Sequence, residues 1–247
     1  MTKFNAELFC KEIRNLLDRI DTEEQKNIDS AVKIIYNAMS NGKLLHVFCT
    51  GHSHMIAEEF FYRAGGLLPV NPILIPFLMQ HEGAASSTQF ERLTGVAEIL
   101  FNGTDILDGE PMLIASNSGI NSVPIEMAIK AKEKGLPVIV ITSAEVSKTA
   151  NSRHVSGKKL YEFGDVVIDT ATPKGDSILE FDGGMKTGSV SSIISLYIVQ
   201  KIVIGVVETF LKNGEEPPVF KSANLPNGDE FNKKLLEKYK GRIRSLY

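Results

Sequence analysis

Hydrophobic positions along this chain follow two different spacings. Short continuous apolar runs at residues 44–49, 112–115 and 138–142 predict buried strands. Between these runs, apolar residues recur every three or four positions, which predicts helices that bury one face. Strands and helices that alternate in this way favour a parallel sheet covered by helices on both faces.

The same reading places the remaining elements. Two further strands are expected at residues 71–76 and 165–169. Capping boxes at Thr22–Gln25 and Thr88–Glu91 predict helix starts, because the first hydroxyl and the last acid or amide can satisfy free backbone amides. Residues 77–87 show no period, and the glycine-rich residues 170–189 are expected to be irregular. Helices are expected at residues 4–20, 22–40, 88–101, 123–134 and 191–212, with a last one from Asn227.

Composition restricts the function classes. The net charge of −3 gives no electrostatic basis for binding nucleic acid or an anionic membrane. The apolar run at residues 193–207 is too short to span a bilayer, and the first residues contain no signal-peptide core. Cys10 and Cys49 lack metal-type spacing and fit a reducing compartment, so we expect a cytoplasmic protein without metal or cofactor.

Two polar turns stand where strands are expected to end. The first is Thr50, Gly51, His52 and Ser53, and the second runs from Ser116 to Ser122. A helix follows each turn, and unpaired amides at a helix start attract anions. One such turn alone is usually an ordinary helix cap. Two of them at one edge of a parallel sheet favour a ligand-binding site.

At these residues the chain resembles the sugar isomerase (SIS) domain family. Thr50–Ser53 with Ala57, Glu58 and Glu59 resembles the first family motif. The turn Ser116, Asn117, Ser118, Gly119, with the helix and strand that follow it, is similar to the second. Residues 152–160 are similar to a stretch in a bacterial phosphosugar-binding, phosphoheptose-isomerase-like branch. The similarity extends over residues 28–211.

The resemblance implies a three-layer α/β/α sandwich of flavodoxin-like type, with a five-stranded parallel sheet. We expect residues 1–247 to form a single domain, with a core at residues 28–211 and helical extensions at residues 1–27 and 212–247. The resemblance also implies a homodimer, and the apolar helix at 191–212 predicts an oligomer, either dimer or tetramer. Regulators in this family carry an additional DNA-binding domain. About forty residues precede the first strand here, so we expect no nucleic-acid partner.

By position, the resemblance implies a phosphosugar ligand in the two turns. Family phosphate ligands correspond to Ser53, Ser116, Asn117 and Ser118. The family often has Thr or Ser where this chain has Asn121, and Ser122 could compensate. The expected phosphosugar-binding residues are Thr50, Gly51, His52, Ser53, Ser116, Asn117, Ser118, Gly119, Asn121 and Ser122.

Aldose–ketose isomerisation through an enediol needs a base, and ring opening needs a second acid–base group. Adjacent Glu58 and Glu59 point in different directions on a helix, and flanking residues favour Glu59 for the site. His81 and Glu82 lie together in an irregular segment, where polar residues are more often functional. His54 follows the phosphate turn. The expected catalytic residues are Glu59, His81, Glu82 and His54, although each could equally be a solvated or capping residue.

Other polar residues are candidates for the same site. Arg153 and Lys158 could close over an anionic sugar or form a solvated basic face. Asp176, Glu180 and Asp182 could hold sugar hydroxyls or simply solvate a loop.

The sequence therefore favours a phosphosugar isomerase, or a lyase with similar chemistry, in carbohydrate derivative metabolism. A non-catalytic phosphosugar-binding sensor and a scaffold whose turns are only helix caps remain alternatives.

Overall fold

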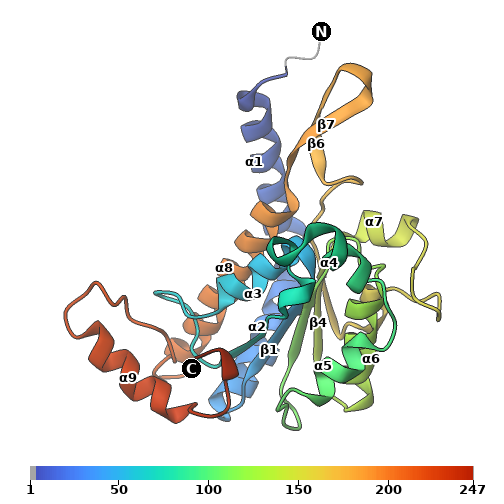
Figure 1. Cartoon of the computed structure of the whole chain (residues 1–247). Coiled ribbons are helices and arrows are strands. Elements are labelled where there is room, and N and C mark those ends of the chain that lie inside the picture. Colours follow the sequence, from blue (N-terminus) through green and yellow to red (C-terminus); the bar gives the residue numbers. More distant parts are fainter. Residues whose placement is uncertain (1–3, 247) are drawn as a thin grey trace.

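A five-stranded parallel sheet forms the centre of the molecule. The computed structural model describes residues 4–246, and its sheet has the strand order β2-β1-β3-β4-β5 (Figure 1). All four pairings are parallel, as predicted. The strands are β1 (Leu45–Cys49), β2 (Val70–Ile73), β3 (Met112–Ala115), β4 (Val138–Thr142) and β5 (Val166–Asp169). The predicted positions are confirmed for β3 and β4 and differ by up to three residues at the ends of the others.

Helices cover both faces of the sheet, which confirms the three-layer α/β/α architecture. On one face, apolar side chains of α2, α3 and α8 pack on alternate strand residues such as Val47 and Leu113. On the other face, α5 and α6 pack on the intervening residues Phe48 and Ile114. The helices are α1 (Ala6–Glu23), α2 (Gln25–Ser40), α3 (His54–Phe60), α4 (Ala84–Phe90), α5 (Val96–Asn102), α6 (Ser122–Glu133), α7 (Ala144–Thr149), α8 (Ser191–Lys212) and α9 (Gly228–Lys238).

Neither predicted capping box begins a helix. Thr22 lies in the last turn of α1, where its hydroxyl donates to the carbonyl of Asp18. Thr88 lies inside α4, and its hydroxyl donates to the carbonyl of Ala84. In both places the preceding residues already form a helix, so the amides that a cap would satisfy are internally paired. The expected helix at residues 88–101 is therefore two helices, α4 and α5, and Glu91 follows the end of the first.

The glycine-rich stretch after β5 is ordered into a hairpin, which corrects the expectation of an irregular segment. Strands β6 (Ser177–Phe181) and β7 (Met185–Ser189) pair in antiparallel fashion and extend beside α1 away from the body (Figure 1). Phe4 and Phe181 form an edge-to-face pair at 5.7 Å where the two elements meet. An isolated hairpin is only marginally stable, so this contact and those between β6 and α1 help to hold it.

Helix α8 is both long and apolar. By length and composition alone it could cross a membrane, in contrast to our estimate from residues 193–207. One side of it, which includes Ile198, Val199 and Ile202, is buried in the core against α2. Its outer side leaves Ile204 and Leu211 more than 60% exposed. The helix is thus a core element with an uncovered apolar face.

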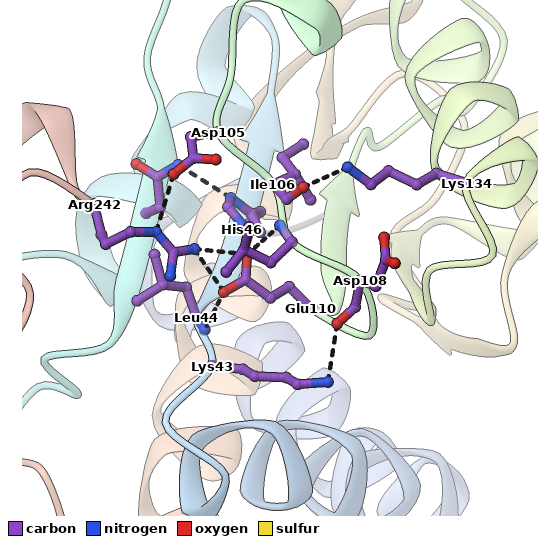
Figure 2. A network of polar contacts seen from close by, with 11 residues as sticks. Lys43, Leu44, His46, Asp105, Ile106, Asp108, Glu110, Lys134 and Arg242 are labelled. Carbon is purple, nitrogen blue, oxygen red and sulfur yellow. Dashed lines mark hydrogen bonds and ion pairs between the residues drawn. The ribbon is translucent and has the colours of Figure 1, made fainter.

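A buried polar network lies at the amino ends of the strands (Figure 2). His46 in β1 bonds to Glu110 at 2.8 Å, and both side chains are fully buried. Arg242, beyond α9, donates to both carboxylate oxygens of Glu110 at 2.9 and 3.1 Å. Burial alone would raise the pKa of Glu110, but hydrogen bonds from His46, two backbone amides and Arg242 hold it at about 2. The ion pair between Arg242 and Glu110 attaches the C-terminal extension to the amino ends of the strands. The polar turns lie at the opposite, carboxyl ends of the strands.

Candidate functional site

A cleft of about 250 Å³ opens at the carboxyl ends of the strands. It is bordered by the turn after β1, the turn after β3 and Thr170 directly after β5. The chain runs from β1 outward to β2 and then returns to β3 on the other side of β1. Ligands of doubly wound sheets bind where the strand order reverses in this way. The structure thus brings the two polar turns together in one cleft at the point where the strand order reverses.

The first turn forms one wall of the cleft with all four of its predicted residues. Thr50, Gly51, His52 and Ser53 all line the space. The amide of Ser53 donates to the carbonyl of Thr50 at 3.2 Å, which closes a tight helical turn before α3. Gly51 has a φ of +56°, a left-handed conformation that glycine adopts without strain. A small residue here lets the backbone approach a ligand closely.

The second turn forms the opposite wall with Ser116, Asn117 and Ser118. The side-chain oxygen of Asn117 accepts hydrogen bonds from Thr172 at 2.6 Å and Thr170 at 3.4 Å. Hydroxyl groups that donate to this oxygen fix the amide orientation, so the Nδ2 group is directed away from them. The turn therefore presents two hydroxyls and one oriented amide donor.

Two predicted binding residues support the second turn and do not line the cleft. Gly119 has a φ of +61°, and a Cβ there would lie 2.8 Å from the Ser147 hydroxyl and 2.9 Å from that of Thr142. Ser122 is fully buried, and its hydroxyl donates to the carbonyl of Arg153 at 3.3 Å. Both residues therefore hold the second turn in place by close packing or hydrogen bonding, without lining the cleft.

Glu91 is a cleft residue that the sequence reasoning did not select. It follows α4, lines the cleft and accepts a hydrogen bond from Thr50. Asn121 Nδ2 donates to its Oε1 at 2.7 Å. Burial raises the pKa of the Glu91 carboxyl, although the Thr50 bond and the charges of Arg92 and Arg153 oppose this. The only available signal was its place in a Thr-x-x-Glu pattern, which we interpreted as a cap.

The four expected catalytic residues lie outside this cleft. Glu59 accepts a hydrogen bond from Gln200 of α8 at 2.5 Å and pairs with Arg63. His81 and Glu82 are both more than half exposed, with 3.7 Å between imidazole and carboxylate. Their roles are therefore not supported by proximity to the two turns.

His54 is buried beside a second hollow, of about 230 Å³, that also includes His81 and shares Gly51 and Gln80 with the cleft. Its Nδ1 bonds to the carbonyl of Gly51 at 3.0 Å, and burial lowers its pKa. A carbonyl only accepts, so the proton lies on Nδ1. Within residues 4–246, Nε2 of His54 has no hydrogen-bond partner.

Among the three loop acids, only Asp176 reaches the cleft. Its carboxylate accepts from the amide and the hydroxyl of Ser191 at 2.7 and 2.8 Å, so it caps the start of α8. Glu180 and Asp182 are exposed on the hairpin. Arg153 and Lys158 do not line the cleft either. Ser191, Ser192 and Ser195 add further hydroxyls to its wall.

The cleft is polar but has little positive charge. None of its lining residues, as far as the chain is described, is Lys or Arg. An anion there would be held by neutral hydroxyl, amide and backbone donors and by the positive ends of helix dipoles. No group of three or more His, Cys, Asp or Glu residues in the described part is arranged to hold a metal ion. The cleft therefore offers hydroxyl and amide donors beside two carboxylates, those of Glu91 and Asp176.

Comparison with known proteins identifies the family. Residues 8–143 match the SIS domain family. The UPF0309 protein of Geobacillus thermodenitrificans is 41% identical over 239 residues, which are 96% of each chain.

Solved structures show the same fold at low sequence identity. The phosphoheptose isomerase from Francisella tularensis has a TM-score of 0.53 and 15% identity, over 84% of this chain and all of that one. The sugar isomerase domain of the RpiR transcription factor from Sphaerobacter thermophilus has a TM-score of 0.52 and 13% identity, over 94% and 96% of the two chains. On the sequence match and its coverage, this chain belongs to the SIS domain family.

Proposed function

We propose that the cleft binds a phosphorylated sugar. The observation that supports this most is the meeting of two hydroxyl-rich turns, without a lysine or arginine, at the switch point of the sheet. Hydroxyls and backbone amides bind a phosphate and leave space for sugar hydroxyls in the same small cleft. Family membership and the phosphosugar enzymes among the solved structures of this fold agree with this ligand class.

The reaction we propose is aldose–ketose isomerisation through an enediol, with Glu91 as the group that moves the proton. A carboxylate can take a proton from one carbon and return it to the neighbouring carbon. Glu91 lines the cleft, and its raised pKa brings it closer to neutral pH, where a general base works best. We therefore transfer the catalytic role from Glu59, His81, Glu82 and His54 to Glu91.

A second group is needed to open the sugar ring. His52, Glu91 and Asp176 are the titratable side chains among the described lining residues. Asp176 is occupied in capping α8. His52 is exposed at the edge of the cleft and is the group we assign to ring opening. A lyase that uses the same enediol chemistry would employ the same residues.

Solvent exchange tests the catalytic proposal without knowledge of the product. Sugar phosphates incubated with the protein in D₂O should gain deuterium at the carbon next to the carbonyl, as followed by proton NMR. Glu91→Gln should abolish exchange and retain binding, because the amide cannot accept the proton. Glu59→Gln is the matched control and should retain exchange. Loss of exchange in the Glu59 variant alone would return the catalytic role to that residue.

A phosphosugar sensor is the alternative, and one observation favours it. The Glu91 carboxylate is already engaged by Thr50 and Asn121, as a purely structural carboxylate would be. A sensor would bind the same ligands and show no exchange with any of them. Binding without exchange across the whole panel would therefore favour the sensor.

We also propose that the protein works in the cytoplasm as a homodimer, with tetramer as the alternative. The uncovered face of α8, with Ile204 and Leu211 exposed next to Val203 and Val207, supports an oligomer. Sedimentation should show a species larger than the monomer, and Ile204→Glu should weaken it. A single monomeric species in the wild type would contradict this proposal.

A further inference from the structure

The segment that follows α7 is fastened to the back of the second turn. The amide of Arg153 donates to the carbonyl of Ile120 at 2.8 Å, and the amide of Leu160 donates to that of Gly119 at 2.9 Å. The hydroxyl of Ser122 donates to the carbonyl of Arg153 at 3.3 Å. The phosphosugar proposal gives this segment no role, although residues 152–160 carry one of the sequence resemblances described above.

Internal hydrogen bonds give this segment a fixed shape. The Ser152 hydroxyl donates to the carbonyl of Lys158 at 2.6 Å, and His154 Nδ1 bonds to the Ser156 hydroxyl at 2.7 Å. His154 Nε2 also lies 3.6 Å from the carboxylate of Glu126 in α6. The Arg153 side chain therefore starts from a well-defined backbone position.

Arg153 points its guanidinium at the amide of Asn121. Its Nη1 donates to Asn121 Oδ1 at 2.6 Å. A guanidinium has only donors, so the oxygen of the amide must face it. Asn121 Nδ2 is consequently on the other side, where it donates to Glu91 Oε1 at 2.7 Å. Arg153, Asn121 and Glu91 form a chain of hydrogen bonds that runs from the segment into the cleft.

We propose that Arg153 is a positioning residue that acts through Asn121 on Glu91. It fixes the Asn121 amide with its N–H group toward the Glu91 carboxylate, and this arrangement favours the ionised form that a base requires. Arg153 does not line the cleft. The catalytic role of these hydrogen bonds rests on the proposed function. The hydrogen bonds themselves are present whether or not that function is correct.

Several groups around Glu91 influence its pKa, and a test of the proposal must distinguish the effect of Arg153 from the others. Thr50 and Asn121 donate hydrogen bonds to its carboxylate, and Arg92 and Arg153 supply nearby positive charge. These four groups favour the ionised carboxylate, whereas burial favours the neutral acid and so raises the pKa. Loss of Arg153 removes one charge and also releases the Asn121 amide, which can then turn its oxygen toward Glu91.

NMR titration of protein labelled at the glutamate side-chain carboxyl carbon measures the pKa of Glu91 directly, with Glu91→Gln for assignment. We expect Arg153→Met to raise this pKa by about 0.5 unit or more, because a charge and an oriented donor are lost. Arg153→Lys, which retains the charge, should restore part of the shift. Lys158→Met is the matched control from the same segment and should leave the pKa unchanged, because Lys158 lies over the ring of Phe163.

A double-mutant cycle shows whether the effect passes through Asn121. Asn121→Ala should raise the Glu91 pKa, and adding Arg153→Met should then have less effect than it has in the wild type. An unchanged Glu91 pKa in Arg153→Met, or full additivity in the double variant, would overturn the proposal. If Arg153→Met does not fold, Arg153→Lys and Asn121→Ala carry the same test. The titration needs no sugar, so its result is independent of whether the protein binds or isomerises one.

Discussion

Asn121 and Glu91 are joined by a hydrogen bond of 2.7 Å, although they belong to different connections of the sheet. Glu91 lies between α4 and α5, and Asn121 directly precedes α6 without a side-chain capping bond to that helix. The expectation from the family motif is a Thr or Ser at the position of Asn121. Here Asn121 lines the cleft, and its amide bonds to a carboxylate and to an arginine.

We expect Glu91→Gln to stabilise the protein at neutral pH. The folded-state pKa of Glu91 is raised, so the unfolded state loses this proton more readily and ionisation at neutral pH disfavours folding. Glutamine cannot ionise, and it keeps the acceptor for Asn121. Its advantage should therefore be largest above the folded pKa and disappear as the pH falls below the ordinary value of 4.5. Urea unfolding at several pH values measures this.

Glu82→Gln is the control for that measurement, because Glu82 is more than half exposed. It should change the free energy of unfolding little at any pH. Equal free energies of unfolding for the Glu91→Gln variant and the wild type at pH 8 would show that ionisation of Glu91 does not destabilise the folded protein.

Gly119→Ala should remove ligand binding and destabilise the fold by about 2 kcal/mol or more. The added Cβ would lie within 3 Å of the hydroxyls of Ser147 and Thr142, and the backbone is in the left-handed region. Gly135→Ala is the matched control, because Gly135 has a φ of +72° and nothing within 4 Å of an added Cβ. It should cost only the backbone strain, about 1 kcal/mol, and leave binding intact. Equal losses in the two variants would mean that the turn is not tightly packed.

Thr172→Val should weaken ligand binding about five- to tenfold, in line with the roughly 1 kcal/mol that one hydrogen bond contributes. The hydroxyl of Thr172 holds Asn117 Oδ1 at 2.6 Å, and without it the amide can rotate out of its donor orientation. Thr149→Val, an exposed threonine on α7, serves as the control. Isothermal titration calorimetry gives the affinities. Unchanged binding in Thr172→Val would exclude Asn117 as an oriented donor.

Arg242→Met should destabilise the protein by about 2 kcal/mol without changing ligand affinity. It leaves the buried Glu110 carboxylate without its double hydrogen bond, at the end of the sheet opposite the cleft. The low pKa of Glu110, about 2, means that this carboxylate stabilises the fold above pH 4.5 and loses that effect as the pH falls toward 2. Acid unfolding of the variant should therefore begin at higher pH. Arg244→Met, on an exposed position, should match the wild type.

The fold could be predicted because its signals are local. The β-branched run Val138–Thr142 and the apolar helix Ser191–Lys212 each specify their element without help from distant residues, and both are confirmed with the same bounds. The polar turns could be identified for the same reason. Their residues are consecutive, and the parallel sheet places them side by side.

The rest depends on contacts that the local sequence does not encode. Thr88 and Glu91 have the spacing of a capping box, but α4 begins earlier because Gly83, with a φ of 149°, provides its start. Glu91 is thereby free to enter the cleft. Glu59 is one turn from the phosphate loop, but α3 turns it toward Gln200 of α8. The hairpin β6–β7 was missed because its glycines are typical of irregular chain, whereas contacts of β6 with α1 and with Phe4 just before it order the hairpin.

Binding of sugar phosphates tests the central claim most directly. The measurement is a thermal-shift panel of heptose, hexose, pentose, hexosamine and muramic acid phosphates, with inorganic phosphate as the control. A ligand at one hundred times its dissociation constant should add about 2.7 kcal/mol to the stability of the folded state. We predict a clear shift for one class, well beyond that of phosphate, and its loss in Gly119→Ala. No shift with any sugar phosphate at millimolar concentration would contradict the account and leave the two turns as helix caps.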